Sequence, residues 1–154
     1  MANTQAMTTS FKVDLFNAVH AFNATGIPAH TVATADVFKA ALYVTTATVN
    51  ASTTAYSATN EVSGTGYSAG GVTVTFGTAP NSSGTTSFLT PSASITYTTV
   101  TLSTSFDAML LYNDTNATDK SVAVYTFTAQ TVAAGTFSLT MPTNDASTGL
   151  LRIA

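Results

Sequence analysis

The sequence contains no cysteine and very few ionised side chains. Without cysteine the chain can form no disulfide bond, no thiolate zinc site and no cysteine nucleophile. Only 7 % of its 154 residues are charged, whereas about 25 % is usual for a soluble domain. Threonine, serine and asparagine supply the polarity instead. Because an isolated domain generally keeps its surface charged, this composition predicts a surface covered by neighbouring subunits, as in an assembled shell or tube.

Positive charge is scarce and dispersed. The formal net charge is −3, and the basic residues are Lys12, Lys39, Lys120 and Arg152. Binding to a phosphate backbone requires clustered lysine and arginine, so nucleic acid is not expected as a partner. The apolar runs are too short to cross a bilayer, and residues 1–16 lack the pattern of a signal peptide. We therefore expect no membrane association, and folding in the cytoplasm in which the chain is made.

Residues 10–22 have the periodicity of an amphipathic helix. Ser10 is the expected N-cap, and Gly26 and Pro28 prevent the helix from continuing. An isolated helix of this length is marginal in water, so its apolar side must pack either on the chain's own sheet or on a neighbouring subunit. The candidate contact residues on that side are Phe11, Leu15, Phe16, Val19 and Phe22.

The chain divides into an N-terminal arm, helix and linker over residues 1–35 and a β domain over residues 36–154. Aromatic and β-branched residues alternate with polar ones in short stretches that turn-forming residues separate. Around Thr98 and Thr99 the alternation changes phase, which predicts a β-bulge. Strands are predicted at residues 37–46, 72–76, 95–103, 106–113, 122–128, 136–141 and 149–154. In the first of them the alternate positions Phe38, Ala40, Leu42 and Val44 are expected on one face. The predicted fold is all-β, an antiparallel β-sandwich or barrel, jelly-roll-like arrangements included.

Residues 59–74, "TNEVSGTGYSAGGVTV", contain four of the nine glycines of the chain. A phosphate-binding loop places its glycines between a strand and a helix N-terminus, usually with a lysine after them. Here the glycines precede "VTVTF", which has the pattern of a strand, and no lysine or arginine follows closely. Gly70 and Gly71 instead supply positive φ angles for a bend that starts a strand. We interpret the segment as part of the scaffold.

Other candidate chemical groups are isolated in the sequence. His20 and His30 lie on either side of a helix-breaking segment, and no pattern joins them to a nucleophile. Asp107, Asp114 and Asp119 cluster near one predicted strand end, where carboxylates could bind Ca²⁺, but they lack the spacing of a calcium loop. The sequence therefore predicts no catalytic residue, no cofactor and no metal site.

Two tyrosines fall outside the predicted strands. Tyr56 and Tyr67 lie in the irregular stretch before residue 72, where their rings could stack on sugars or lock a long loop against a sheet. Together with Asp114 and Asp119 in the "NDTNATDK" loop they are the candidate residues for surface recognition. The locking role is the preferred interpretation, and recognition of a ligand remains the alternative.

Several segments, in order along nearly the whole chain, resemble a known group of proteins. They are "SFK…LF…VHAF", "FKAALY", "TTAYSATNEVSGTGYSAGG", "LLYNDT" and "LLRIA". This series resembles the small virion structural proteins of tailed bacteriophages. The resemblance implies a component of the particle and not an enzyme: a head decoration (cement) protein, a tail or head-to-tail joint component, or a fibre base. It implies the major capsid protein or tail subunits as partners, besides further copies of the chain, and localisation in the virion.

Three hypotheses follow for function. The leading one is a capsid decoration protein whose helix clamps a neighbouring subunit, many copies turning weak contacts into firm attachment. The second is a receptor-binding or carbohydrate-binding module displayed on the virion. The third, a glycan hydrolase, requires two carboxylates facing each other at about 5 to 9.5 Å.

Overall fold

A computed structural model describes residues 2–16, 19–22 and 34–154, and the side chain of Phe16 lies outside this description. Strands predominate in two antiparallel sheets, one with the order β1-β7-β6-β2-β3 and the other with the order β4-β5-β8. The predicted all-β fold with a short helix is confirmed, and the sheets do not close into a barrel. The elements are β1 (Ala6–Met7), α1 (Thr9–Phe16), β2 (Phe38–Val44), β3 (Val72–Val74), β4 (Asn81–Ser83), β5 (Thr86–Leu89), β6 (Ile95–Asn113), β7 (Lys120–Leu139) and β8 (Leu151–Ile153).

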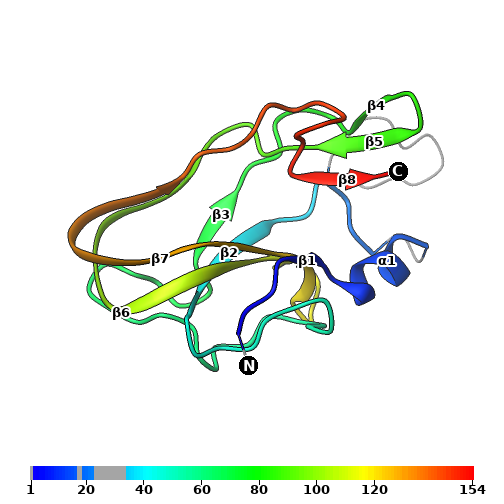
Figure 1. Ribbon diagram of the computed structural model, residues 1–154. Helices are drawn as coiled ribbons and strands as arrows, with labels where there is room; N and C mark the ends of the chain where they lie inside the picture. Colours follow the sequence, from blue (N-terminus) through cyan, green and yellow to red (C-terminus); the bar gives the residue numbers. More distant parts are fainter. Residues whose placement is uncertain (1, 17–18, 23–33) are drawn as a thin grey trace.

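The two longest strands organise the molecule. β6 has 19 residues and β7 has 20, and they pair antiparallel from Ile95↔Leu139 to Asn113↔Lys120. The sequence predicted four shorter strands here, which is wrong, because the polar stretches that separate them continue the ladder. Figure 1 shows this ribbon bending back over the larger sheet, so that its two halves lie in different layers. Bulges allow such bending because they increase the local twist.

The predicted bulge in β6 is confirmed. The register shifts between Tyr97 and Val100, and Thr99 takes a left-handed φ of 54°. The shift keeps Tyr97, Val100 and Leu102 all buried, although their spacing in the sequence breaks strict alternation. The β4–β5 hairpin was not predicted, because "NSSGTTSFL" is mostly polar and all three residues of β4 are exposed.

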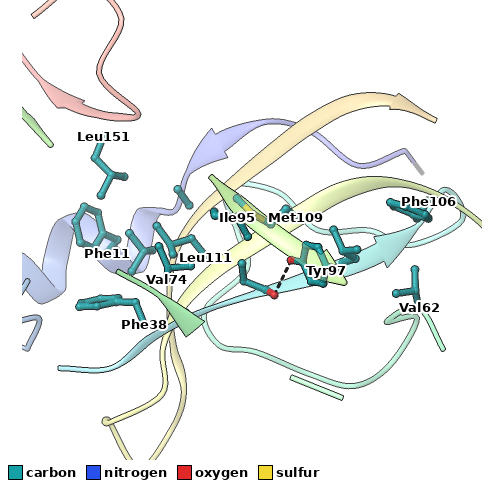
Figure 2. Close-up of a cluster of buried hydrophobic side chains, with 14 of the residues drawn as sticks. Phe11, Phe38, Val62, Val74, Ile95, Tyr97, Phe106, Met109, Leu111 and Leu151 are labelled. Carbon is teal, nitrogen blue, oxygen red and sulfur yellow. Dashed lines mark hydrogen bonds between the residues drawn. The ribbon is translucent and has the colours of Figure 1, made fainter. Parts of the chain in front are cut away.

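The larger sheet is covered on both faces. One face carries the main core, to which α1 and the smaller sheet contribute through Phe11 and Leu151 (Figure 2). The hydroxyl of Tyr97 donates a hydrogen bond of 2.8 Å to the Ala40 carbonyl inside this core. The opposite face is covered by the long β2–β3 connection. The second cluster there consists of Ala41, Tyr43, Ala47, Val49, Ala108, Leu110, Tyr112 and Val124.

β2 lies between β6 and β3, and both of its faces are buried because the main core covers one and the β2–β3 connection covers the other. Phe38, Ala40 and Leu42 share one face as predicted, and Ala41 and Tyr43 fill the other. The sequence prediction of a strand with one buried face was therefore incomplete. A central strand is expected to read as a nearly continuous apolar run when both of its faces are covered.

The first residues differ from the predicted extended arm. β1 pairs with β7, Ala6 opposite Val124, as an edge strand of the larger sheet. The side chain of Asn3 accepts a hydrogen bond from the Val49 amide at 3.1 Å and donates one to Asp107 at 2.6 Å. The described residues before α1 are thus part of the sheet and do not reach away from it.

The helix is shorter than predicted. α1 ends at Phe16, residues 19–22 are not helical, and residues 17–18 lie outside the description. Thr8, not Ser10, is the N-cap, since its hydroxyl accepts the Phe11 amide at 3.3 Å. Beyond the helix, Ala21 and Asp36 exchange backbone and side-chain hydrogen bonds, and this long-range pairing replaces further helical turns. No helix among the described residues has the length and apolarity needed to cross a membrane.

Candidate functional site

A carboxylate, Glu61, holds the long β2–β3 connection together. One of its oxygens accepts the Tyr67 hydroxyl at 2.7 Å and the Gly70 amide at 2.8 Å, and the other accepts the Tyr56 hydroxyl at 2.6 Å. No pattern in the sequence indicated a role for Glu61. The only usable signal was its position between two tyrosines, in a segment otherwise without charge.

The two tyrosines are packed within the chain. The ring of Tyr56 stacks on Tyr112 with centroids 4.7 Å apart, and Tyr67 stacks on Tyr97 at 5.8 Å. The oxygen of Tyr67 also accepts the Leu42 amide at 3.0 Å. Burial, with the neighbouring Glu61 carboxylate, raises the pKa of both hydroxyls. Of the two alternatives from the sequence, this geometry corresponds to the locking of a loop against a sheet.

The glycines of this connection act through their conformation, as predicted. Gly70 and Gly71 have φ angles of 87° and 76°, and strand β3 follows them directly. A Cβ atom on Gly71 would lie 1.6 Å from the Ala40 carbonyl oxygen, so only glycine fits against β2 here. The hydroxyl of Tyr112 donates a hydrogen bond of 2.9 Å to the Gly70 carbonyl and so holds the bend against β6.

The aspartates of the sequence-predicted cluster have separate partners. Asp114 forms an ion pair of 3.0 Å with Lys39. Asp119 lies in a turn with φ 48°, and its carbonyl accepts the Tyr56 amide at 2.9 Å. The carboxylate of Asp107 accepts the hydrogen bond from the Asn3 side chain. Among the described residues, no group of three or more His, Asp or Glu side chains lies close enough together to hold a metal ion. His30 lies outside the described residues.

The predicted apolar side of the helix is divided between the core and the surface. Phe11 is only 2 % exposed and belongs to the main core. Phe22 stacks on Phe38 with ring centroids 4.3 Å apart, and Val19 is half-buried. Leu15 instead remains 39 % exposed. For Phe11 and Phe22 the docking is therefore within the chain, and Leu15 is left facing outward.

Leu15 lines a narrow apolar groove between α1 and β8, which lie at the same end of the molecule (Figure 1). We call it the α1–β8 groove. Its volume is about 140 Å³, and Ile153, which is 46 % exposed, lies on its other wall. Leu15 and Ile153 also line an adjoining hollow of about 570 Å³ that includes Lys12 and Arg152. The remaining lining residues of the groove are Phe11, Phe22, Pro80, Ser87, Phe88, Leu89 and Leu151.

Comparison with known proteins gives no relative from which a role could be transferred. No protein-family model, no curated protein and no solved structure matches the chain.

Proposed function

We propose that the chain is a non-enzymatic structural component of a tailed-bacteriophage virion, a capsid decoration protein that attaches to capsid subunits. Two features of the sequence support this: the co-linear resemblance to small virion proteins and a charged fraction of only 7 %. A surface with few charges loses little hydration energy when a neighbouring subunit covers it. The all-β body, with both faces of its larger sheet covered, suits a rigid spacer between subunits.

The observation that carries the proposal is the exposure of Leu15 and Ile153 on the α1–β8 groove. Leu15 is a contact residue that the sequence predicted, and it is the most exposed of those whose side chains the structure describes. Large apolar side chains grouped around a groove are typical of contact sites between proteins. The occupant that we propose is an apolar segment of the capsid protein, inserted between α1 and β8.

A single groove of this size gives weak binding, and copy number makes the attachment firm. A decoration protein is therefore expected in hundreds of copies per particle. Quantitative mass spectrometry of purified virions of the source phage measures this directly. About a dozen copies would contradict decoration of the head and indicate the tail or the joint, and absence from the virion would contradict the whole proposal.

Substitution at the groove tests the contact itself. Leu15→Glu removes an apolar side chain that is 39 % exposed in the free chain and places a charge against the apolar walls of the groove. Binding to undecorated capsids should therefore weaken by about tenfold or more. Val13→Glu is the matched control, because Val13 is 56 % exposed on the same helix but does not line the groove. Equal binding by the two variants would exclude the groove as the contact. Loss of a dimer in Leu15→Glu would show that a second copy is the occupant.

A further inference from the structure

His20 is enclosed by aromatic rings at the start of the segment that follows the helix. Its side chain is fully buried. The ring centroids of Phe11, Phe22 and Phe38 lie 5.1, 6.2 and 6.2 Å from that of the imidazole. Neither the fold prediction nor the proposed function assigns it a role.

One side of the imidazole faces Asn113, whose amide orientation is fixed. The Asn113 side-chain oxygen accepts the amides of Thr115 at 3.0 Å and Asn116 at 3.2 Å. Its Nδ2 therefore points the other way, donating to Asp36 at 2.7 Å and lying 3.2 Å from Nδ1 of His20. Nδ2 also donates to the Val19 carbonyl at 3.4 Å, the longest of its three contacts. Because an amide nitrogen only donates, we assign Nδ1 of His20 as an acceptor and place the proton of the neutral imidazole on Nε2.

The other side of the imidazole faces a carboxylate that it does not reach. Nε2 lies 3.8 Å from Oδ2 of Asp14, beyond hydrogen-bond distance. Both atoms are buried without a hydrogen-bond partner. The neutral ring is thus held mainly by Asn113 and by the surrounding phenyl rings.

We propose that His20 is an acid-operated latch, which holds residues 19–22 against β6 and β2 while it is neutral and releases them when it is protonated. Protonation places a hydrogen on Nδ1, opposite the hydrogen of Asn113 Nδ2, so two donors face each other at 3.2 Å. Asn113 cannot turn its amide over without losing the bonds to Thr115 and Asn116. Relief comes from moving the segment, and the stack of Phe22 on Phe38 is lost with it.

The charged groups around His20 have opposite effects on its pKa. Asp14 on α1 and Asp36 before β2 favour the imidazolium, whereas Lys120 on β7 disfavours it. Burial is the largest influence and brings the pKa of His20 below its ordinary value of 6.5. The unfolded or released histidine takes up its proton near pH 6.5, whereas the latched one does so only at a lower pH. The latched state therefore loses stability as the pH falls below 6.5, down to the lowered pKa.

Hydrogen exchange of the Ala21 amide reports the latch, because this amide bonds to Asp36 at 2.8 Å. With intrinsic exchange rates corrected, the opening constant of the full chain should rise as the pH falls below about 6.5, by no more than about tenfold per pH unit. His20→Phe keeps an aromatic ring without a titrating group, so its opening constant should not change with pH. His30→Gln, the control at the other histidine, should behave as the original chain. The same pH dependence in His20→Phe would overturn the proposal.

A second measurement stands independently of whether His20→Phe folds. Long-range ¹⁵N NMR of the imidazole in the original chain should show the Nε2–H tautomer at about pH 7.5. An Nδ1–H tautomer, or an imidazole still charged at that pH, would equally overturn the latch. Neither measurement depends on the proposed function in the virion.

Discussion

Glu61 illustrates how one side chain can order a long connection. The structure between β2 and β3 has few backbone ladders, yet three donors from Tyr56, Tyr67 and Gly70 converge on this carboxylate. Hydrogen bonds to a charged acceptor are roughly twice as strong as neutral ones. Since Tyr56 and Tyr67 also stack on tyrosines of β6, the carboxylate links the connection to the sheet at two places.

Replacing this carboxylate by an amide tests its role. Glu61→Gln turns one acceptor oxygen into a donor that faces Tyr56 or Tyr67, so we expect a loss of about 1.5–3 kcal/mol in the free energy of unfolding. Urea denaturation measures the change. Asp114→Asn is the matched control, because its ion pair with Lys39 is partly exposed and should contribute less than about 1 kcal/mol. Similar losses in the two variants would mean that Glu61 is no more than a surface charge.

At the scale of elements, the position of β3 depends on how closely the chain approaches β2. Ala40 pairs with Val72, and the residue just before Val72 lies against the Ala40 carbonyl. Gly71 allows this approach because it has no Cβ atom and because its φ of 76° is unfavourable for other residues. β3 has only three residues, so its register has little else to hold it.

Two glycine substitutions distinguish the steric cost of a Cβ atom close to β2 from the cost of a positive φ angle alone. Gly71→Ala must shift β3 away from β2 and should cost about 3 kcal/mol or more, measured by thermal or urea unfolding. Gly84→Ala in the β4–β5 turn meets only the backbone cost of about 1–2 kcal/mol, because φ is 58° there and no atom lies within 4 Å of the added Cβ. If Gly71→Ala were as mild as Gly84→Ala, the contact with Ala40 could not determine the register.

At the scale of the whole molecule, the six tyrosines pack on both faces of the larger sheet. They are distributed over β2, β6, β7 and the β2–β3 connection. Burial raises the pKa of every one of them, to about 12 for Tyr43. The folded chain therefore holds these phenolic protons more tightly than the unfolded chain, in which the tyrosine pKa is near its ordinary value of 10.0.

This difference predicts how the molecule unfolds in alkali. Because the folded state binds more protons above pH 10, its stability is complete below that pH and falls as the pH rises further. Phenolate absorbance should stay low until the chain unfolds and then rise in one cooperative step together with the loss of β-sheet circular dichroism. A gradual rise of phenolate absorbance near pH 10 in folded protein would contradict the packing of these rings.

Local patterns in the sequence predicted much of the secondary structure. The β-bulge at Thr98 and Thr99, the bend at Gly70 and Gly71 and the shared face of Phe38, Ala40 and Leu42 are properties of neighbouring residues, since strands alternate with period two and only glycine readily takes a positive φ. The scarcity of charge is equally a property of the sequence alone. These features could be predicted because each depends on steric preferences within a few residues.

The tertiary structure determined the contacts between residues that are far apart in the sequence. The joining of four predicted strands into β6 and β7, the burial of both faces of β2 and the end of α1 at Phe16 all depend on partners far away in the sequence. The contact between His20 and Asn113, which are 93 residues apart, also depends on the tertiary structure. So does the difference in burial between Phe11, which lies in the core, and Leu15, which is exposed. The physical reason is that burial and hydrogen bonding are satisfied between segments. A residue's local preference states which contacts it can make, and only the packed chain determines which of them it makes.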